Sequence, residues 1–527
     1  MYLKTIHQNP TFKKLRNLSK ERRRKMNKGR LSKNLFANII SYAISILLSF
    51  LVTPFIVNNL GKEIYGFYGI ANNVVSYITI IAVALNSMAA KYITVEVVRG
   101  NQLKAKQYYS SIFFSNIILC VVLAPILGIV VANLSGFLKI SSQYYTQVQV
   151  LFALVFSAML LRFSTSIFGS ATYATNRMDL SAYVDISKSV LRLILFAFLF
   201  LLLKPSIIYL GIVLFLLELF NAVVQIFLAK KLLPEITIKK KYFDFKLIVS
   251  TLKVGVWNSL NQLGDLMLSS SDLIMANILI GESASGNISI IKTMPSLVSG
   301  VITAINTVFM PRVAYEYAKN STKSLVKEIQ QAQKIMGAII TPIVMLLIVF
   351  GLDFYALWVP GNDIDLLGKL SAIDISRMAL IAVVWPVSNL NIVLDKVKIP
   401  SILVICSGIV NVASMALLTK TTNMGVFAIV ITTLVLTILF YGIFIPIYPS
   451  KLLNLSWNTF IFPIGQMIIS IVISGPILVL LHSTFSINNW IDFILCGGLC
   501  AIPTFLISIF TFVGPKTIVK IINNWRK

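Results

Sequence analysis

Acidic residues are scarce in this sequence: 19 Asp and Glu stand against 46 Lys and Arg, and only 12% of the 527 residues are charged. Histidine and cysteine are scarcer still, with two and four copies. All four cysteines fall inside long apolar segments, while His7 lies in a polar tail and His482 at a predicted helix end. Because neither a disulfide framework nor a metal-ligand spacing of Cys and His is visible, we expect no metal site and no cofactor.

Apolar residues, by contrast, make up 57% of the chain, and its mean hydropathy is +0.84. A soluble core of this size would not bury so much apolar surface. Apolar runs of about 20 residues, long enough to cross about 30 Å of hydrocarbon, recur along the whole length. The sequence therefore predicts an all-α, polytopic membrane protein with fourteen spans, at 35–59, 67–94, 109–134, 147–170, 181–203, 207–229, 250–280, 284–311, 335–358, 368–394, 400–418, 423–447, 459–482 and 490–513.

The basic residues behind the net charge of +27 gather in alternate loops, which argues against nucleic acid as a partner. They concentrate in the tail at 1–33 and after even-numbered spans, most densely in KKLLPEITIKKKYFDFK at 230–246. The positive-inside rule then places both termini and this segment in the cytoplasm. The basic tail either stays solvated and fixes the orientation or binds anionic lipid at the membrane surface.

An internal repeat organises the chain. VNNLGKEIYGFYGI at 57–70 is matched by NILIGESASGNISI at 277–290, so that Gly61 and Gly66 reappear 220 residues later as Gly281 and Gly286. Matches in the same register fall on polar positions, namely Lys33 with Lys253, Asn38 with Asn258, Ser49 with Ser269, Ser76 with Ser296, Asn86 with Asn306 and Glu96 with Glu316. In each copy the glycines are expected to permit a tight outer hairpin.

A repeat that starts at spans 1 and 7 contains six crossings, so both copies enter the membrane in the same direction. We therefore predict two parallel, pseudo-symmetric six-helix lobes, an architecture of transporters whose lobes rock around a central cavity. The predicted domains are a basic cytoplasmic tail (1–33), an N-lobe with spans 1–6 (34–229), a cytoplasmic linker (230–249), a C-lobe with spans 7–12 (250–449), and spans 13 and 14 with the C-terminal tail (450–527).

Polar and ionisable side chains inside the spans mark the candidate functional residues, because a charge at mid-bilayer costs at least about 2.5 kcal/mol. Helical spacing places a polar stripe on span 7 (Asn258, Gln262, Asp265, Ser269, Asp272) and another on span 8 (Ser289, Lys292, Ser296, Ser299, Thr303, Asn306). We expect both stripes to face a neighbouring helix or water. Asp272 and Lys292 form either a structural ion pair or a ligand site, while Asp374 and Arg377 are predicted to pair with each other.

Two stretches resemble a known family. The first hairpin, NIISYAISILLSFLVTPFIVNNLGKEIYGFYGI, is similar to the start of polysaccharide-export and O-antigen (Wzx-type) flippases of the multidrug/oligosaccharidyl-lipid/polysaccharide exporter superfamily. The segment DKVKIPSILVICSGIVNVASMALLTKTTNMGVFAIVITTLV at 395–435 resembles spans 11 and 12 of that family. The resemblance implies a MATE-like fold that flips undecaprenyl-diphosphate-linked oligosaccharides across the bacterial inner membrane by alternating access, for assembly of O-antigen, capsule or exopolysaccharide. Implied partners are membrane lipids, a polysaccharide polymerase and chain-length machinery.

A diphosphate and a hydroxyl-rich sugar need a wet, polar cavity. Our candidates for diphosphate contact are four basic residues inside the spans, Arg162, Lys188, Arg192 and Lys292. Our candidates for ion coupling are three acidic residues, Asp265, Asp272 and Glu218. Asp265 has no basic residue within a turn or two on its own helix, so it either exchanges a coupling ion or is a hydrogen-bonded structural residue paired across the lobe, for which Lys292 is one candidate partner.

Two other functions share parts of this pattern. A cation-coupled multidrug exporter of the same superfamily would have a cavity dominated by acids and aromatics, and such exporters often carry a carboxylate in span 1, where this chain has none. Lipid II flippases usually concentrate arginines in the first two spans, and none lies between Leu35 and Lys91. A membrane polysaccharide polymerase would have a long outer loop with reactive residues, whereas the loops near 135–146 and 359–367 are short. These differences favour an oligosaccharide flippase that is not an enzyme.

Overall fold

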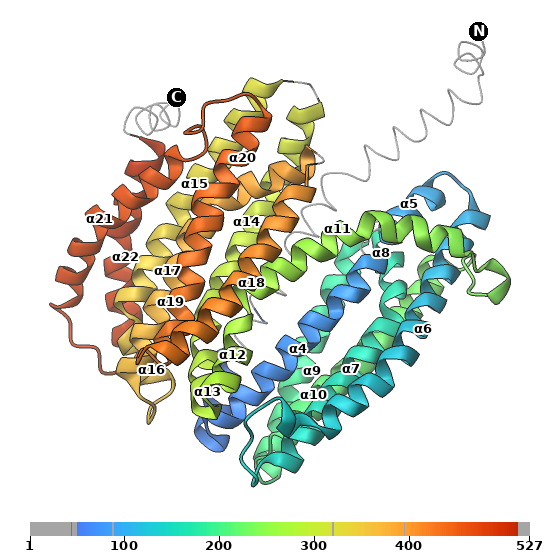
Figure 1. Cartoon of the computed structure of the whole chain (residues 1–527), viewed down its shortest axis with the longest axis horizontal. Helices are drawn as coiled ribbons and strands as arrows, with labels where there is room; N and C mark the ends of the chain where they lie inside the picture. Colours follow the sequence, from blue (N-terminus) through green and yellow to red (C-terminus); the bar gives the residue numbers. More distant parts are fainter. Residues whose placement is uncertain are drawn as a thin grey trace.

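The computed structural model of the chain describes Ile44 and residues 50–86, 89–175, 177–318, 321–394 and 396–514 (Figure 1). The predicted tail at 1–33, most of span 1 and the C-terminal tail lie outside the described residues. The α-helices are α4 (Lys62–Asn86), α5 (Ala89–Val98), α6 (Gln102–Ala132), α7 (Tyr145–Thr165), α8 (Ser170–Ala174), α9 (Met178–Leu202), α10 (Ile208–Leu232), α11 (Phe245–Ser269), α12 (Ser271–Leu279), α13 (Glu282–Ile291), α14 (Thr293–Ala318), α15 (Thr322–Val349), α16 (Gly351–Trp358), α17 (Ile364–Val393), α18 (Lys398–Thr421), α19 (Val426–Thr437), α20 (Ile445–Leu452), α21 (Phe462–His482) and α22 (Trp490–Val513). Single turns η2 (Leu134–Gly136), η3 (Ser166–Gly169) and η4 (Lys240–Tyr242) and a π-helix, η5 (Ile438–Phe444), complete the described elements.

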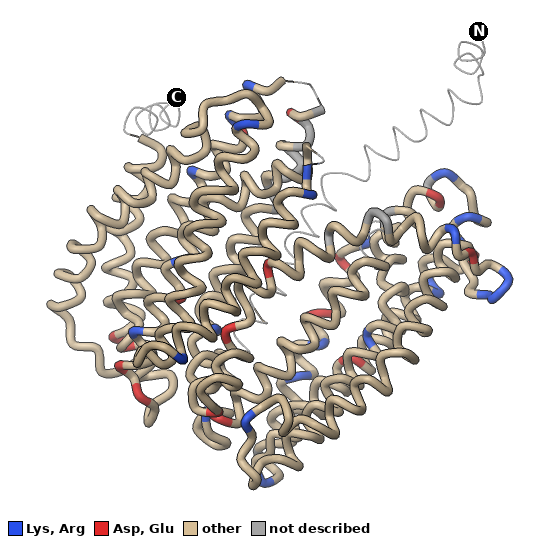
Figure 2. The backbone as a smooth tube through the Cα atoms, in the orientation of Figure 1, with Lys and Arg blue, Asp and Glu red and all other residues tan. Residues whose placement is uncertain are grey.

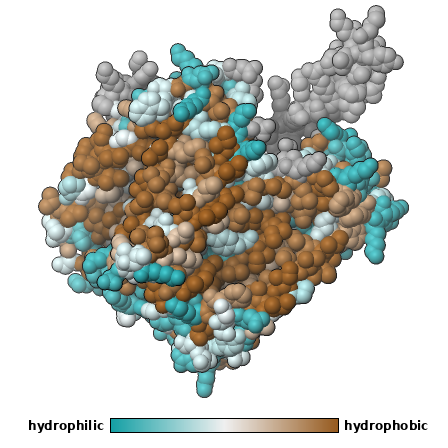
Figure 3. Space-filling view, in the orientation of Figure 1, coloured by the Kyte–Doolittle hydropathy of each residue, from teal (hydrophilic) through white to brown (hydrophobic). Residues whose placement is uncertain are grey.

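The predicted all-α membrane fold is confirmed. Eleven helical segments of the described chain are long and apolar enough to cross a membrane. The other three predicted spans correspond to the helical segment Phe50–Leu60, to α9 and to α11. Apolar side chains cover a broad band of the surface, with hydrophilic residues gathered toward its edges, as expected of a protein surrounded by lipid (Figure 3).

The helices form two bundles (Figure 1). One contains α4 to α10, and the other contains α12 to α22, with α21 and α22 on its outer side. The bundles meet where α4 packs against α12 and α13, and they diverge toward the opposite end, where α5 lies. Helix α11 packs against α18 of the second bundle and also along α4 of the first: the Ser259 hydroxyl donates to the Ile80 carbonyl at 3.1 Å. The domain boundaries predicted from the repeat remain a proposal.

The glycines of the repeat have two different roles. Gly61 (φ 89°) and Gly281 (φ 150°) adopt positive φ in the expected tight turns. Gly66 and Gly286 instead lie inside α4 and α13, facing each other: a Cβ on Gly66 would lie 2.9 Å from the Gly286 nitrogen, and one on Gly286 would lie 2.6 Å from the Lys62 carbonyl oxygen. Positions equated by the repeat therefore touch each other where α4 packs against α13.

Two predicted spans are interrupted at a single residue, each about a third of the way along from the turn at Gly281. The span predicted at 250–280 divides into α11 and α12 at Ser270, and the span predicted at 284–311 divides into α13 and α14 at Lys292. The first break frees the carbonyl oxygen of Ser270, which accepts a hydrogen bond from the Asn73 amide at 3.0 Å. Pro295 lies in the first turn of α14, where a missing N–H is tolerated. The span at 250–280 is therefore not one continuous helix, whereas Glu282–Asn306 still forms one membrane-length segment across the turn at Lys292.

The predicted linker packs against the first bundle. Residues 233–244 separate α10 from α11, and the backbone N–H groups of Lys239 and Asp244 donate to the hydroxyls of Ser110 (3.3 Å) and Ser111 (2.8 Å) on α6. The Asp244 carboxylate caps the first turn of α11. Lys and Arg gather at this end of the first bundle (Figure 2).

We predict that this linker is cytoplasmic. In a variant with Cys120, Cys406, Cys496 and Cys500 replaced by serine, Lys240→Cys should stay unlabelled when an impermeant maleimide is added outside intact cells. Lys204→Cys, in the short segment between α9 and α10, should be labelled and serves as the matched control. Strong labelling of position 240 from outside would refute the topology.

Candidate functional site

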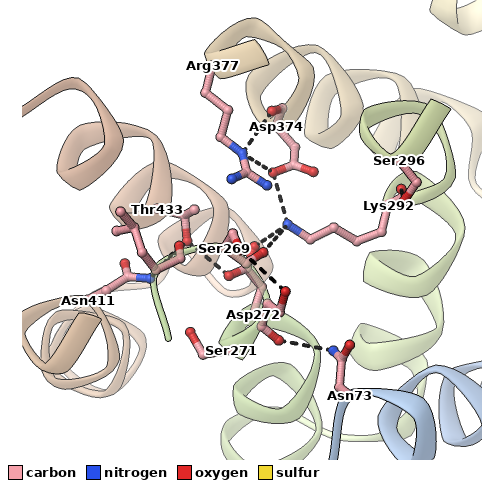
Figure 4. Close-up of polar contacts among 12 residues, drawn as sticks. Asn73, Ser269, Ser271, Asp272, Lys292, Ser296, Asp374, Arg377, Asn411 and Thr433 are labelled. Atoms are coloured by element: carbon pink, nitrogen blue, oxygen red, sulfur yellow. Dashed lines mark hydrogen bonds and ion pairs between the residues drawn. The ribbon is translucent and has the colours of Figure 1, made fainter. Parts of the chain in front are cut away.

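Four charged side chains form one network at the two helix breaks (Figure 4). The Lys292 ammonium lies 2.5 Å from Asp272 Oδ2 and 3.1 Å from Asp374 Oδ1, and the Arg377 Nε lies 2.9 Å from the same Asp374 oxygen. Asp272 and Asp374 have no exposed side-chain surface, and the Arg377 side chain is 3% exposed. Two cations and two anions make the network neutral, which is the condition under which buried charges persist.

Neighbouring helices complete this network. The Thr433 hydroxyl of α19 donates to Asp272 Oδ1 at 3.1 Å, and Asn411 of α18 donates to the Leu268 carbonyl at 3.2 Å. Lys292 also donates to the Ser269 carbonyl at 3.4 Å. Both ion pairs considered from the sequence are therefore present, and Lys292 joins them across α12, α13 and α17. The predicted substrate and coupling roles of Lys292 and Asp272 remain proposals.

A cavity of about 340 Å³ lies between the two bundles beside this network. On one side it is lined by α4, with Tyr65, Tyr68, Asn72 and Asn73. On the other side lie Ser289, Lys292, Ser296, Ser299 and Arg377. The predicted polar stripe of span 8 thus faces a cavity along much of its length, as expected for polar groups kept away from lipid.

The first bundle contains its own charged cluster. Lys188 on α9 lies 2.9 Å from Glu218 Oε1 on α10, and Asn221 donates to the other Glu218 oxygen at 3.3 Å. Asp185 lies within the electrostatic reach of Lys188, Glu218 and Arg162. The sequence predicted these residues separately, and the structure brings them together.

Arg162 and Arg192 are the two candidate diphosphate contacts whose charge no described carboxylate balances through an ion pair. Neither guanidinium group forms an ion pair or a hydrogen bond with any residue that the structure describes. Arg192 is not among the residues that line the cavity between the bundles, but its charge acts on Tyr65, which does line it. Five free N–H donors in a planar fork suit the oxygens of a phosphate group.

Asp265 is held by neutral donors. Asn261 donates to its Oδ2 at 3.1 Å, and the Tyr441 hydroxyl donates to its Oδ1 at 3.1 Å. No cation pairs with it in the described part of the chain, and Lys292 is engaged with Asp272 and Asp374. Lys292 is therefore not the partner of Asp265, while a structural role for Asp265 through its hydrogen bonds stays an alternative to ion coupling. Of the three predicted coupling residues, Asp265 alone lacks a cationic partner among the described residues.

Asp265 lines a second cavity, of about 270 Å³, whose other residues were not singled out from the sequence except Gln262. Trp257 and Asn261 come from α11, Trp385 and Asn389 from α17, and Tyr441 from η5. A π-helix often marks a functional position, because the extra residue in its turn displaces side chains from the regular helical spacing. The only sequence signal was the density of aromatic and amide residues in apolar helices.

Residues 31–315 match the family described as polysaccharide biosynthesis protein, which is more than half of the 527-residue chain. The chain belongs to this family. The matched range includes Arg162, Lys188, Arg192, Glu218, Asp265, Asp272 and Lys292.

This polysaccharide biosynthesis protein is also similar to individual proteins along most of its length. It is 24% identical over 480 residues to the uncharacterized membrane protein EpsK of Bacillus subtilis (strain 168), covering 91% of this chain and 94% of the relative. An inward-facing MATE family multidrug resistance transporter of the MOP superfamily matches with a TM-score of 0.65 and 15% identity, over 76% of this chain and 92% of the other. The lipid II flippase MurJ, in an inward closed conformation, matches with a TM-score of 0.63 and 13% identity, over 91% of this chain and 98% of the flippase. The fold is therefore that of MOP superfamily transporters.

If Asp265 couples this family member to an ion gradient, Asp265→Asn should remove the dependence of transport on that gradient while the protein folds normally. The asparagine oxygen still accepts from Tyr441, and no cation among the described residues loses a partner. Transport into proteoliposomes with and without an imposed proton or sodium gradient measures the effect, with Asp365→Asn as the exposed control. Gradient-dependent transport at the wild-type rate by Asp265→Asn would remove the residue from the mechanism.

Proposed function

We propose that this protein flips undecaprenyl-diphosphate-linked oligosaccharide units across the bacterial inner membrane for assembly of a surface polysaccharide. Family membership supports polysaccharide biosynthesis as the process. The single structural observation that carries the proposal is the cavity between two membrane-embedded bundles, polar on both walls and lined by Lys292 and Arg377. Such a cavity suits a charged headgroup whose lipid tail stays in the bilayer.

In this proposal the diphosphate binds between the bundles. Arg192 is the strongest candidate contact, because its guanidinium has no carboxylate partner among the described residues and its charge acts on Tyr65, which lines the cavity. Lys292 faces the same cavity, with 21% of its side chain exposed, but its charge is already balanced by two carboxylates. Arg162 and Lys188 would contact the diphosphate when it moves toward the first bundle, where Lys188 is paired with Glu218.

Transport would proceed by alternating access. The bundles meet at the α4–α13 contact and diverge toward the end with the basic loops, which the charge distribution assigns to the cytoplasm (Figures 1 and 2). The structure then corresponds to a state that opens inward. Closing that end and parting α4 from α13 would expose the headgroup to the outside, and Asp265, Asp272 and Glu218 would link the movement to an ion gradient.

A genetic experiment tests the proposed function. Cells that lack the protein should stop producing the surface polysaccharide and should accumulate undecaprenyl-diphosphate-linked oligosaccharide on the cytoplasmic leaflet, measured by mass spectrometry of lipid extracts. Expression of the wild-type chain should reverse both effects. Unchanged polysaccharide and unchanged lipid-linked pools in the deletion would contradict the proposal. The polymerase and chain-length machinery implied as partners would act on the flipped unit outside.

A further inference from the structure

The cavity that contains Asp265 has a composition unlike that of the cavity between the bundles. Indole rings of Trp257 and Trp385 stand beside the carboxamides of Asn261, Gln262 and Asn389. Among the residues that the structure describes, no lysine or arginine lines it, and Asp265 is the one carboxylate of its lining. Its ligand therefore needs many hydrogen bonds and an apolar face, but no strong charge.

Two carboxamide side chains on the wall of this cavity have hydrogen-bonding groups to spare. Gln262 is exposed, and its side chain forms no hydrogen bond to any described residue. Asn389 donates to Asn306 at 3.0 Å, and its own carboxamide oxygen accepts no hydrogen bond from a described residue. A carboxamide offers both donors and acceptors, so a ligand that both donates and accepts hydrogen bonds would suit this wall.

A saccharide fits these requirements. Each sugar hydroxyl donates one hydrogen bond and accepts others, so it can pair with both the NH₂ group and the oxygen of a carboxamide. The C–H face of a sugar ring packs on an aromatic ring. A drug cation would instead favour a cavity lined by several carboxylates, whereas the described lining of this cavity contains one, Asp265. The volume of about 270 Å³ is at the lower limit of ligand sites, which suits one or two sugar rings of a longer chain.

The cavity also lies where a sugar could enter. Val397 and Pro400, at the start of α18, form part of its lining, and the exposed Lys398 lies between them with its ammonium 5.8 Å from the centre of the Trp257 ring. The cavity thus lies toward the end assigned to the cytoplasm, separate from the network of Asp272, Lys292, Asp374 and Arg377. A headgroup bound between the bundles could extend its sugar chain into this cavity.

We propose that this cavity is a saccharide subsite, which binds part of the oligosaccharide through Trp257, Trp385, Gln262 and Asn389. This inference rests on the proposed function and adds a sugar-binding site, distinct from the diphosphate site, within the second bundle. It predicts that the protein recognises the sugar as well as the diphosphate and the lipid.

The test uses purified full-length protein and two separate probes. The first is the oligosaccharide released by mild acid from the undecaprenyl-diphosphate-linked pool of the host cells, which has neither lipid nor diphosphate. The second is undecaprenyl diphosphate without sugar. Binding is measured by calorimetry and by quenching of tryptophan fluorescence, for wild type, Gln262→Leu, Asn389→Leu and the control Asn133→Leu. Asn133 is an exposed amide at the end of α6, far from the cavity in sequence and in the fold.

We expect saturable binding of the released oligosaccharide to wild type and Asn133→Leu, and binding about tenfold weaker to each cavity variant, the effect of one lost hydrogen bond. Undecaprenyl diphosphate should bind all four proteins equally. Gln262→Leu removes no internal hydrogen bond, so it remains informative if Asn389→Leu folds poorly. No saturable binding of the oligosaccharide, or equal binding by all variants, would overturn the subsite even when undecaprenyl diphosphate binds. Failure of the proposed function would give a different result from failure of the subsite. In that case the wild-type protein would bind neither undecaprenyl diphosphate nor the intact lipid-linked oligosaccharide.

Discussion

Asp374→Asn is expected to lower the free energy of unfolding by about 3 to 5 kcal/mol, the usual cost of breaking a buried ion pair from one side. Asp374 is fully buried and contacts both cations of the network, Lys292 at 3.1 Å and Arg377 at 2.9 Å. Without its charge, Asp272 alone balances two positive side chains. The loss should appear as a lower apparent melting temperature of the detergent-purified protein and as reduced protein in the membrane.

The same helix provides the matched control for Asp374→Asn. Asp365 on α17 pairs with Lys369 at 2.5 Å, but the two side chains are 68% and 61% exposed. Asp365→Asn should therefore change stability by less than about 1 kcal/mol. The double variant Asp374→Asn with Arg377→Gln restores neutrality and should recover part of the loss. Equal melting temperatures for Asp374→Asn and wild type would show that the network does not stabilise the fold.

Arg192→Ala should abolish flipping while the amount of folded protein stays normal. Its guanidinium forms no ion pair or hydrogen bond to a described residue, so its removal costs no internal contact, whereas loss of a charged hydrogen-bonded partner of the diphosphate should reduce binding about 30-fold or more. Arg192→Lys should restore transport only in part, because an ammonium group lacks the two-pronged geometry. Surface polysaccharide in complemented deletion cells measures the effect.

Lys204→Ala is the control for Arg192→Ala, because it removes an exposed positive charge just after the same helix. It should leave polysaccharide production unchanged. Wild-type production by Arg192→Ala would reduce Arg192 to a packing role and transfer the diphosphate contact to Arg162, Lys188 or Lys292.

Much of the fold was predictable because hydrophobic length, charge asymmetry and the repeat agree. Helices α9 and α11 show the value of combining these signals. Neither is among the helices that length and apolar composition alone identify as membrane spans, but the repeat and the direction of the neighbouring spans predict a crossing at each. The repeat equated Gly66 with Gly286 and led us to expect each of them in a tight turn; it did not predict that both lie inside helices and contact each other.

The site was less predictable, because the distance between helices is not encoded locally. The pairing of Asp272 with Lys292 and of Asp374 with Arg377 could be inferred from depth and from helical spacing, but their union through Lys292 depends on the breaks at Ser270 and Lys292. The cavity around Trp385, Asn389 and Tyr441 depends on η5, and a π-helix has no reliable sequence pattern.

The measurement that tests the central claim most directly is flipping by the purified protein in proteoliposomes. Undecaprenyl-diphosphate-linked oligosaccharide with a labelled sugar is placed in the inner leaflet, and its appearance outside is followed with an impermeant glycosidase. We predict transfer well above that of protein-free vesicles, and no such transfer with Arg192→Ala. Transfer no faster than in protein-free vesicles, by a preparation that expels a cationic dye instead, would contradict the account and identify a drug exporter.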